Sequence, residues 1–176
     1  MSDQTKTTGD ADGAPAHAAL CLMAERWLRR QGFGVIFHDR FRAITDHGEQ
    51  PDAIGWRGGI SVVIECKATR ADFLADRAKP FRVDPTCGMG DWRFYLAPRD
   101  VIAVADLPSG WGLLHAVGSR VIATHGVPGN VGWHSSAPFV GQKRCEVQML
   151  YSALRRMVLR GHFEAIYEPI PTGVLP

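Results

Sequence analysis

The sequence predicts a single α/β domain with a mixed β-sheet flanked by helices. Amphipathic helical patterns stand near both ends of the chain, and the segments between them are mostly short, apolar and extended. A further helical segment directly follows the most hydrophobic of these strands. The 176 residues are enough for a sizeable core, and 45% hydrophobic with 22% charged residues is typical of a globular domain.

The chain divides into a folded domain and two tails. Residues 1–14 are rich in Ser, Thr, Asp and Gly and are expected to be a disordered N-terminal tail. The domain is expected over residues 15–161, followed by a proline-containing tail over residues 162–176. The first helix is predicted from about Ala16 to Gln31, because apolar residues recur at helical spacing and Gly32 ends the pattern.

A strand is predicted over Phe33 to Phe41, followed by a polar loop over residues 42–50. Glu49 in this loop is either an accessory ligand or a loop acid near a positive site. An apolar hairpin comes next, with one arm at residues 51–56 and the other at residues 60–67. The second arm is rich in β-branched residues, as a buried strand should be.

The second arm ends in Glu65-Cys66-Lys67, with two charges where the strand should still be apolar. Burying charges is costly unless they are paired or bind a metal. Side chains alternate along a strand, so Glu65 and Lys67 share one face and Cys66 points to the other. The hairpin brings Asp52 back beside Glu65. Two close carboxylates repel unless a cation lies between them, and hard oxygen ligands suit Mg²⁺ or Mn²⁺.

Pro51-Asp52, followed by Glu65-Cys66-Lys67 at the end of a hydrophobic strand, resembles the signature of the PD-(D/E)xK nuclease superfamily. Residues 68–77, 88–91 and 93–98 resemble the MmcB-like DNA repair proteins, a bacterial and phage branch of that superfamily. The resemblance covers residues 15 to 160. It implies a restriction-endonuclease-like α/β sandwich.

The resemblance also implies a divalent-metal-dependent nuclease that hydrolyses phosphodiester bonds in DNA, in repair, recombination or phage DNA processing. Its catalytic residues would be Asp52, Glu65 and Lys67, and Mg²⁺ or Mn²⁺ would be held by Asp52, Glu65 and the backbone carbonyl of Cys66. Glu25 is a further candidate ligand, because a glutamate of the first helix often joins the metal site in this superfamily. An exposed helical glutamate is the alternative for Glu25.

A helix is predicted after the hairpin, from Thr69 to about Ala78, with Thr69 as its cap and Phe73 and Leu74 in the core. Basic side chains follow the hairpin and are expected to hold the DNA backbone without reading bases. Solvated surface charge is the alternative for each. The candidates are Arg70, Arg77, Lys79, Arg82 and Arg93.

Three more strands are predicted, at 92–97, 111–117 and 120–124, and the last two form a hairpin. Residues 81–91 and 125–141 are expected to be loops. The last helix is predicted from Gln142 to Arg160, before Gly161. Its apolar stripe consists of Val147, Leu150, Tyr151, Leu154 and Val158.

The remaining features bound the function. The four cysteines are scattered without a CxxC pair, which favours reduced thiols in a cytoplasmic protein over a structural zinc site. No apolar run is long enough for a transmembrane helix, so no membrane partner is expected. DNA is the expected partner, bound by a monomer or homodimer, and a net charge of +2 permits this without demonstrating it. A DNA-binding or complex-forming module that keeps the fold without cleaving is the alternative function.

Overall fold

The structure is a computed structural model that describes residues 15–171 and residue 173. Its strands form one six-stranded sheet in the order β1-β2-β3-β4-β5-β6. The bounds are β1 Val35–His38, β2 Ala53–Arg57, β3 Ile60–Cys66, β4 Trp92–Pro98, β5 Gly112–Val117 and β6 Arg120–His125. The central strands β3, β4 and β5 pair in parallel, and the outer pairs are antiparallel. The predicted α/β class with a mixed sheet is therefore confirmed.

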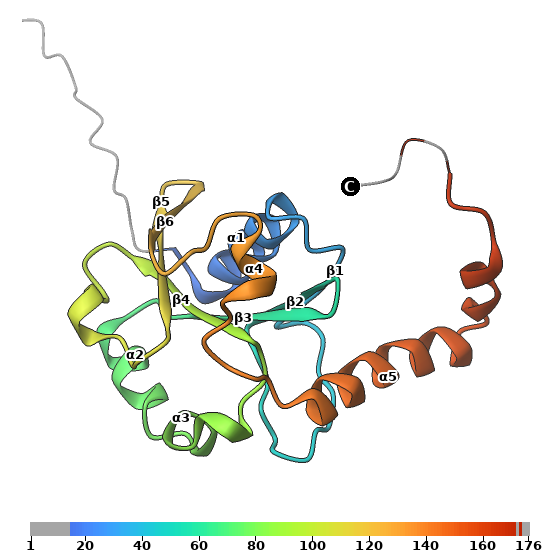
Figure 1. Ribbon diagram of the computed structural model, residues 1–176, viewed down its shortest axis with the longest axis horizontal. Coiled ribbons are helices and arrows are strands. Elements are labelled where there is room, and N and C mark those ends of the chain that lie inside the picture. The colour runs from blue at the N-terminus through green and yellow to red at the C-terminus, as the bar shows by residue number, and fades with distance from the viewer. Residues whose placement is uncertain (1–14, 172, 174–176) are drawn as a thin grey trace, which may run out of the picture.

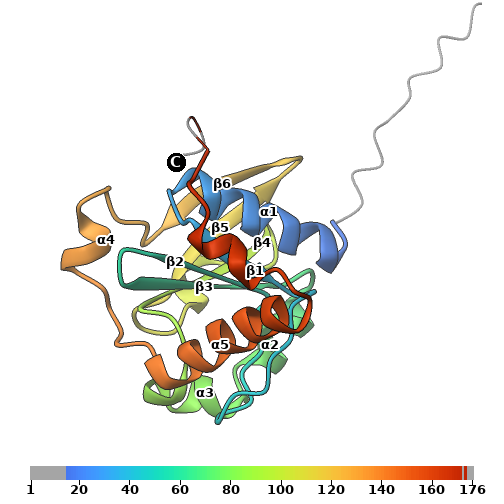
Figure 2. The same ribbon diagram turned by 90° about the vertical axis from the view of Figure 1, so that its right-hand side faces the viewer.

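Helices cover both faces of the sheet, with α1 on one face and α2, α3 and the start of α5 on the other (Figures 1 and 2). None of the helices in the described part of the chain has the length and apolar character needed to cross a membrane. The expected N-terminal tail lies outside the described residues. The α-helical bounds are α1 His17–Arg30, α2 Arg70–Asp76, α3 Pro80–Val83, α4 Gly132–Ser135 and α5 Lys143–Leu159, and 3-10 turns lie at η1 Pro85–Cys87, η2 Val104–Asp106 and η3 Phe163–Tyr167.

Alternation along the central strands sorts their side chains into two core layers. Val62, Ile64 and Cys66 of β3 face α1. Val63 points to the opposite face of the sheet, where it packs in a second cluster of buried residues that includes Met149 of α5. Glu65 shares the face of Val63 by the same alternation. The strand therefore delivers Glu65 and Cys66 to opposite faces, as predicted.

The hairpin and the helix after it form where the sequence predicts them. Thr69 caps α2, and its side chain accepts a hydrogen bond from the backbone N–H of Asp72. Phe73 is buried, but the expectation that Leu74 is also core is wrong, because α2 is short and turns Leu74 toward solvent. The predicted loop over residues 81–91 instead contains most of α3 and all of η1.

The predicted loop over residues 125–141 contains α4, which carries a core residue. Trp133 is buried against Trp27 of α1 and Phe94 of β4, with ring centroids 6.3 and 6.1 Å away. Its carbonyl accepts a hydrogen bond of 3.0 Å from the Trp92 indole. This long connection is thus fixed to the α1 side of the sheet by one large aromatic side chain.

Helix α5 is buried against the domain in its first turns, and Arg156 near its end donates to the Arg42 carbonyl. Glu146 is buried in the first turns and accepts hydrogen bonds from Ser61 Oγ and the Gly90 N–H at 2.7 and 3.0 Å. Beyond these turns α5 runs out from the sheet (Figure 1), and Tyr151 of its predicted apolar stripe is 65% exposed. Four of the five stripe residues are exposed in the described structure, and Leu150 is the half-buried exception.

Candidate functional site

The hairpin brings Asp52, Glu65 and Lys67 together at one end of the sheet. Ala53 pairs with Ile64, so Asp52, the residue before β2, lies beside the last residues of β3. The Lys67 ammonium lies 3.0 Å from Glu65 Oε2 and 3.9 Å from Asp52 Oδ2. All three side chains are largely buried, with Glu65 only 2% and Asp52 17% exposed. A buried strand end thus holds two carboxylates around one ammonium.

Four further charged residues complete this group, which we call the ionic cluster: Glu49, Asp52, Glu65, Lys67, Asp76, Lys79 and Arg82. Asp76, at the end of α2, accepts hydrogen bonds from Lys67 at 3.1 Å and from Arg82 at 2.8 Å. Arg82 of α3 also reaches Glu49 at 2.8 Å and lies 2.9 Å from Glu65 Oε1 without the alignment of a hydrogen bond. Lys79 contacts Asp76 at 2.6 Å at the exposed edge.

Sequence reasoning did not find the roles of Asp76 and Arg82. Asp76 was not among the candidate site residues, and Arg82 was expected to contact DNA. The expectation for Arg82 is wrong, because α2 and α3 turn both side chains inward, where Arg82 is 2% and Asp76 1% exposed. The sequence does offer one signal for this pair. Asp76 and Arg82 lie six residues apart with Pro80 between them, and a break between two short helices can turn both side chains toward one site. Glu49, which was left open between ligand and loop acid, is buried against Arg82.

The electrostatics of the cluster keep Lys67 charged. Burial alone would lower the Lys67 pKa, but the charges of Glu65, Asp76 and Asp52 outweigh burial and raise the pKa above its usual range. Burial would likewise raise the Asp76 pKa, but the charges of Arg82 and Lys67 hold it well below its usual range. Lys67 and Asp76 are thus a fixed cation and a fixed anion at neutral pH.

Asp52 differs from the other carboxylates. Burial, followed by the charge of Glu65, raises the pKa of Asp52 to about 6, although Lys67 and the Cys66 N–H act in the opposite direction. The Cys66 N–H donates to Asp52 Oδ2 at 2.8 Å, which leaves Oδ1 turned toward helix α1. Asp52 is therefore the carboxylate of the cluster that is least satisfied by its partners.

A divalent cation fits the composition of the cluster. Its four carboxylates face three cations, so one negative charge is uncompensated when Asp52 is ionised. The available donors are carboxylate oxygens, which suit Mg²⁺ or Mn²⁺. Both Glu65 oxygens already contact cations, so a metal bound there would share Glu65 with Lys67 or Arg82.

The structure does not bring Glu25 into the cluster. Its carboxylate instead pairs with Arg29 on the next turn of α1, at 2.8 Å, and lies 3.7 Å from His38 of β1. Among the described residues these contacts account for the Glu25 carboxylate, and they favour a helical surface role over that of a metal ligand.

The expected DNA-contacting residues fall into two groups. Arg70 and Lys79 are about half-exposed and Arg77 is exposed, although Arg70 is held by Asp106 at 2.7 Å. Arg93 is buried, and its guanidinium donates to the Pro85 and Gly88 carbonyls at 2.9 and 2.8 Å. Contact with DNA is therefore wrong for Arg93, as it is for Arg82, because neither side chain reaches the surface.

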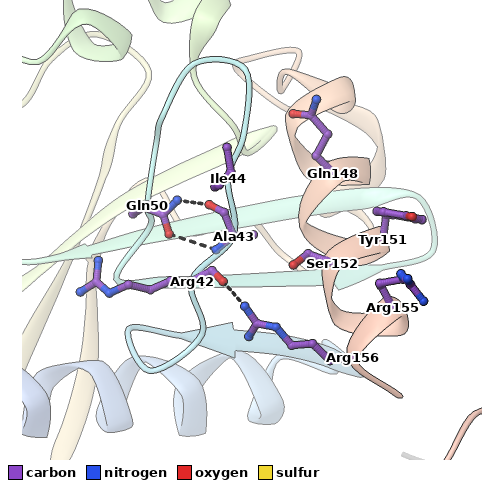
Figure 3. A pocket seen from close by; sticks show the side chains of 9 residues that line it. All are labelled: Arg42, Ala43, Ile44, Gln50, Gln148, Tyr151, Ser152, Arg155 and Arg156. Carbon is purple, nitrogen blue, oxygen red and sulfur yellow. Dashed lines mark hydrogen bonds between the residues drawn. The ribbon is translucent and has the colours of Figure 1, made fainter. Parts of the chain in front are cut away.

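A hollow of about 580 Å³ lies between α5 and the loop over residues 42–50 (Figure 3). Arg42, Arg155 and Arg156 line it, and Arg156 donates to the Arg42 carbonyl. The hollow shares no lining residue with the ionic cluster. Glu49 connects the two regions, because the same loop that borders the hollow delivers Glu49 to Arg82.

Comparison with known proteins supports the fold. No protein-family model matches the chain, and no curated protein sequence does either. A solved structure, the SPO1766 protein of unknown function from Silicibacter pomeroyi, is similar over 96% of this chain and 100% of its own. The identity is 23% and the TM-score 0.55. At this identity the similarity shows a shared fold and nothing about activity.

The raised pKa of Asp52 predicts a pH-dependent stability. Between about pH 4 and pH 6 the unfolded Asp52 has lost its proton while the folded one retains it, so the free energy of unfolding falls as pH rises through this window. Asp52→Asn, which cannot ionise, should not show this fall in the free energy of unfolding. In chelator, chemical denaturation should show the variant gaining up to about 3 kcal/mol on the wild type between pH 4 and pH 7. A pH-independent difference between the two proteins would contradict the assignment.

Proposed function

We propose that this protein is a divalent-metal-dependent nuclease that hydrolyses phosphodiester bonds in DNA. The observation that carries the proposal is the convergence of Asp52, Glu65 and Lys67 at the end of one buried hairpin, within a cluster that has an excess negative charge. The resemblance to PD-(D/E)xK nucleases rests on these same three residues. The shared fold of the solved neighbour neither supports nor opposes the activity.

In this proposal Asp52, Glu65 and the Cys66 backbone carbonyl hold Mg²⁺ or Mn²⁺. A metal held there would lower the pKa of a water molecule and neutralise phosphate charge. Lys67 does not act as the general base, because its raised pKa keeps it protonated and a protonated lysine is a poor base. Lys67 orients the attacking water and stabilises the charge that develops on the phosphate oxygens.

The DNA backbone would be held by the exposed cations beside this site. Lys79 is 44% exposed and lies 3.9 Å from Glu65, so it forms the solvent-exposed edge of the cluster. Arg77 and Arg70 lie on the same short helical segment. Such contacts neutralise phosphates without reading bases.

A cleavage panel tests the proposal. Linear, nicked, single-stranded, flap and junction DNA would be incubated with the full chain in Mg²⁺, in Mn²⁺ and in chelator. We expect metal-dependent cutting of at least one substrate and none in chelator. A matched control is Asp100→Asn, which removes an exposed carboxylate outside the cluster and should cut at the wild-type rate. Cutting that persists in chelator would contradict the metal-dependent mechanism.

The pairing of both Glu65 oxygens with cations favours one alternative, a DNA-binding module that keeps the fold without cleaving. In that case Lys67 and Arg82 would occupy the place of the metal. The same panel separates the two functions. Salt-sensitive DNA binding with no cutting of any substrate in either metal would favour the module.

A further inference from the structure

A second set of candidate ligands lies on the other side of Asp52, outside the ionic cluster. His17 Nε2 lies 3.4 Å from Cys21 Sγ and 3.3 Å from Asp52 Oδ1. The three donor atoms all lie within 4.8 Å of one another. An imidazole, a thiol and a carboxylate therefore converge on one point between α1 and the start of β2.

The fold fixes each of these donors. His17 and Cys21 are four residues apart on α1, so they stand one above the other on the same helix face. The Cys66 N–H donates a hydrogen bond to Asp52 Oδ2, and this leaves Oδ1 facing His17. Cys21 is fully buried, whereas the His17 side chain is 49% exposed. The thiol thus forms the floor of the group, and the imidazole borders solvent.

Two of the three distances between the donors match a tetrahedral metal site. With zinc bonds of about 2.0 Å to nitrogen and oxygen and about 2.3 Å to sulfur, tetrahedral angles separate nitrogen from oxygen by about 3.3 Å and nitrogen from sulfur by about 3.5 Å. The distances from His17 Nε2 to Asp52 Oδ1 and Cys21 Sγ are 3.3 and 3.4 Å. Cys21 Sγ and Asp52 Oδ1 lie within 4.8 Å of each other, and tetrahedral angles would place them about 3.5 Å apart, so a short approach of these two atoms closes the site.

The donor types select the metal. Thiolate and imidazole are ligands of zinc and similar transition metals, whereas Mg²⁺ takes oxygen ligands. Three protein ligands leave the fourth tetrahedral position for water, on the side of the exposed His17. Cysteine spacing did not reveal this group, because only one of its members is a cysteine and Asp52 comes from another element.

We infer that His17, Cys21 and Asp52 form a binding site for zinc or a similar divalent transition-metal ion. Binding forms metal bonds to His17 Nε2, Cys21 Sγ and Asp52 Oδ1 and releases the Cys21 thiol proton to solvent. The site does not depend on nuclease activity. One consequence does rest on the proposed function: zinc here would withdraw Asp52 from Mg²⁺ and inhibit cleavage.

Cobalt(II) is the probe for this site, because a thiolate bound to Co²⁺ gives a near-ultraviolet charge-transfer band. The full chain, reduced and freed of metal by chelation, would be titrated with Co²⁺ without DNA. We expect the band to appear at one equivalent and to disappear when Zn²⁺ is added. Cys21→Ala should abolish it, whereas Cys145→Ala, which removes another buried thiol from a separate core cluster, should retain it.

His17→Ala keeps the test valid if the buried Cys21 variant fails to fold, because His17 is half-exposed. Loss of one of three ligands should weaken Co²⁺ binding by about tenfold or more, since even outer-shell changes cost 10- to 100-fold. His47→Ala removes an exposed histidine elsewhere and should bind Co²⁺ like the wild type. No charge-transfer band in the wild type, or unchanged affinity in His17→Ala, would overturn the inference. Neither result bears on DNA cleavage.

Discussion

Replacing Lys67 with methionine is expected to lower Mg²⁺-dependent DNA cleavage by roughly 100- to 1,000-fold. Methionine retains most of the length and apolar stem of lysine but removes the ammonium that lies 3.0 Å from Glu65 and 3.1 Å from Asp76. The ammonium is the group proposed to stabilise charge on the phosphate. The measurement is the single-turnover cleavage rate at saturating Mg²⁺, so that weaker substrate binding does not enter.

Lys143→Met is the matched control for this variant. Lys143 also pairs with two carboxylates, Asp91 at 2.6 Å and Glu146 at 3.2 Å, but lies at the base of α5, outside the cluster. Both variants therefore lose an ammonium from a paired group, and only Lys67→Met should lose cleavage. Wild-type cutting by folded Lys67→Met, or an equal loss in both variants, would remove Lys67 from the mechanism.

Arg82→Met is expected to destabilise the protein by about 3–5 kcal/mol. The Arg82 side chain is 2% exposed and lies within 2.9 Å of Glu49, Glu65 and Asp76. Its removal leaves three buried carboxylates with too few cations. Urea denaturation at pH 7 measures the loss. The loss should shrink toward pH 4, because protonation removes the unpaired charges.

Arg70→Met provides the comparison at the surface. Arg70 makes a two-point contact with Asp106, but the pair is exposed to water, where such pairs contribute little to stability. We therefore expect a small effect for Arg70 and a large one for Arg82. Similar losses in the two variants would show that Arg82 owes little to its buried partners.

The part of the site that sequence reasoning reached was the part that strand geometry dictates. The period of two along β3 is local, so it places Glu65 and Lys67 opposite Cys66 whatever the rest of the chain does. The hairpin then returns Asp52 through a short turn. The α/β class followed in the same way, because amphipathic helices near both ends and after the hairpin enclose runs of apolar strands.

What sequence reasoning missed depends on tertiary packing. Arg82 and Arg93 carry the same guanidinium as Arg70, and only the turn of α3 and the face of β4 decide that they are buried. The apolar stripe of α5 is the opposite case, because its residues were expected to be covered and are mostly exposed. A helical period shows which residues share a face, but it does not show whether another element packs on that face. Trp133 was hidden in a Gly- and Pro-rich segment that offers no period.

The whole ionic cluster comes from residues 49–82, a single unbroken stretch of the chain. The entropy lost on closing a loop grows with its length, so bringing these charges together costs less than joining distant segments. Segments beyond residue 82 also contact the cluster, because the Met89 N–H donates to Glu49 Oε2 at 2.6 Å and the Tyr95 hydroxyl to Asp76 Oδ2 at 3.0 Å. Substitutions elsewhere in those later segments should therefore weaken the fold as a whole before they change how Glu49, Asp76 and Arg82 meet.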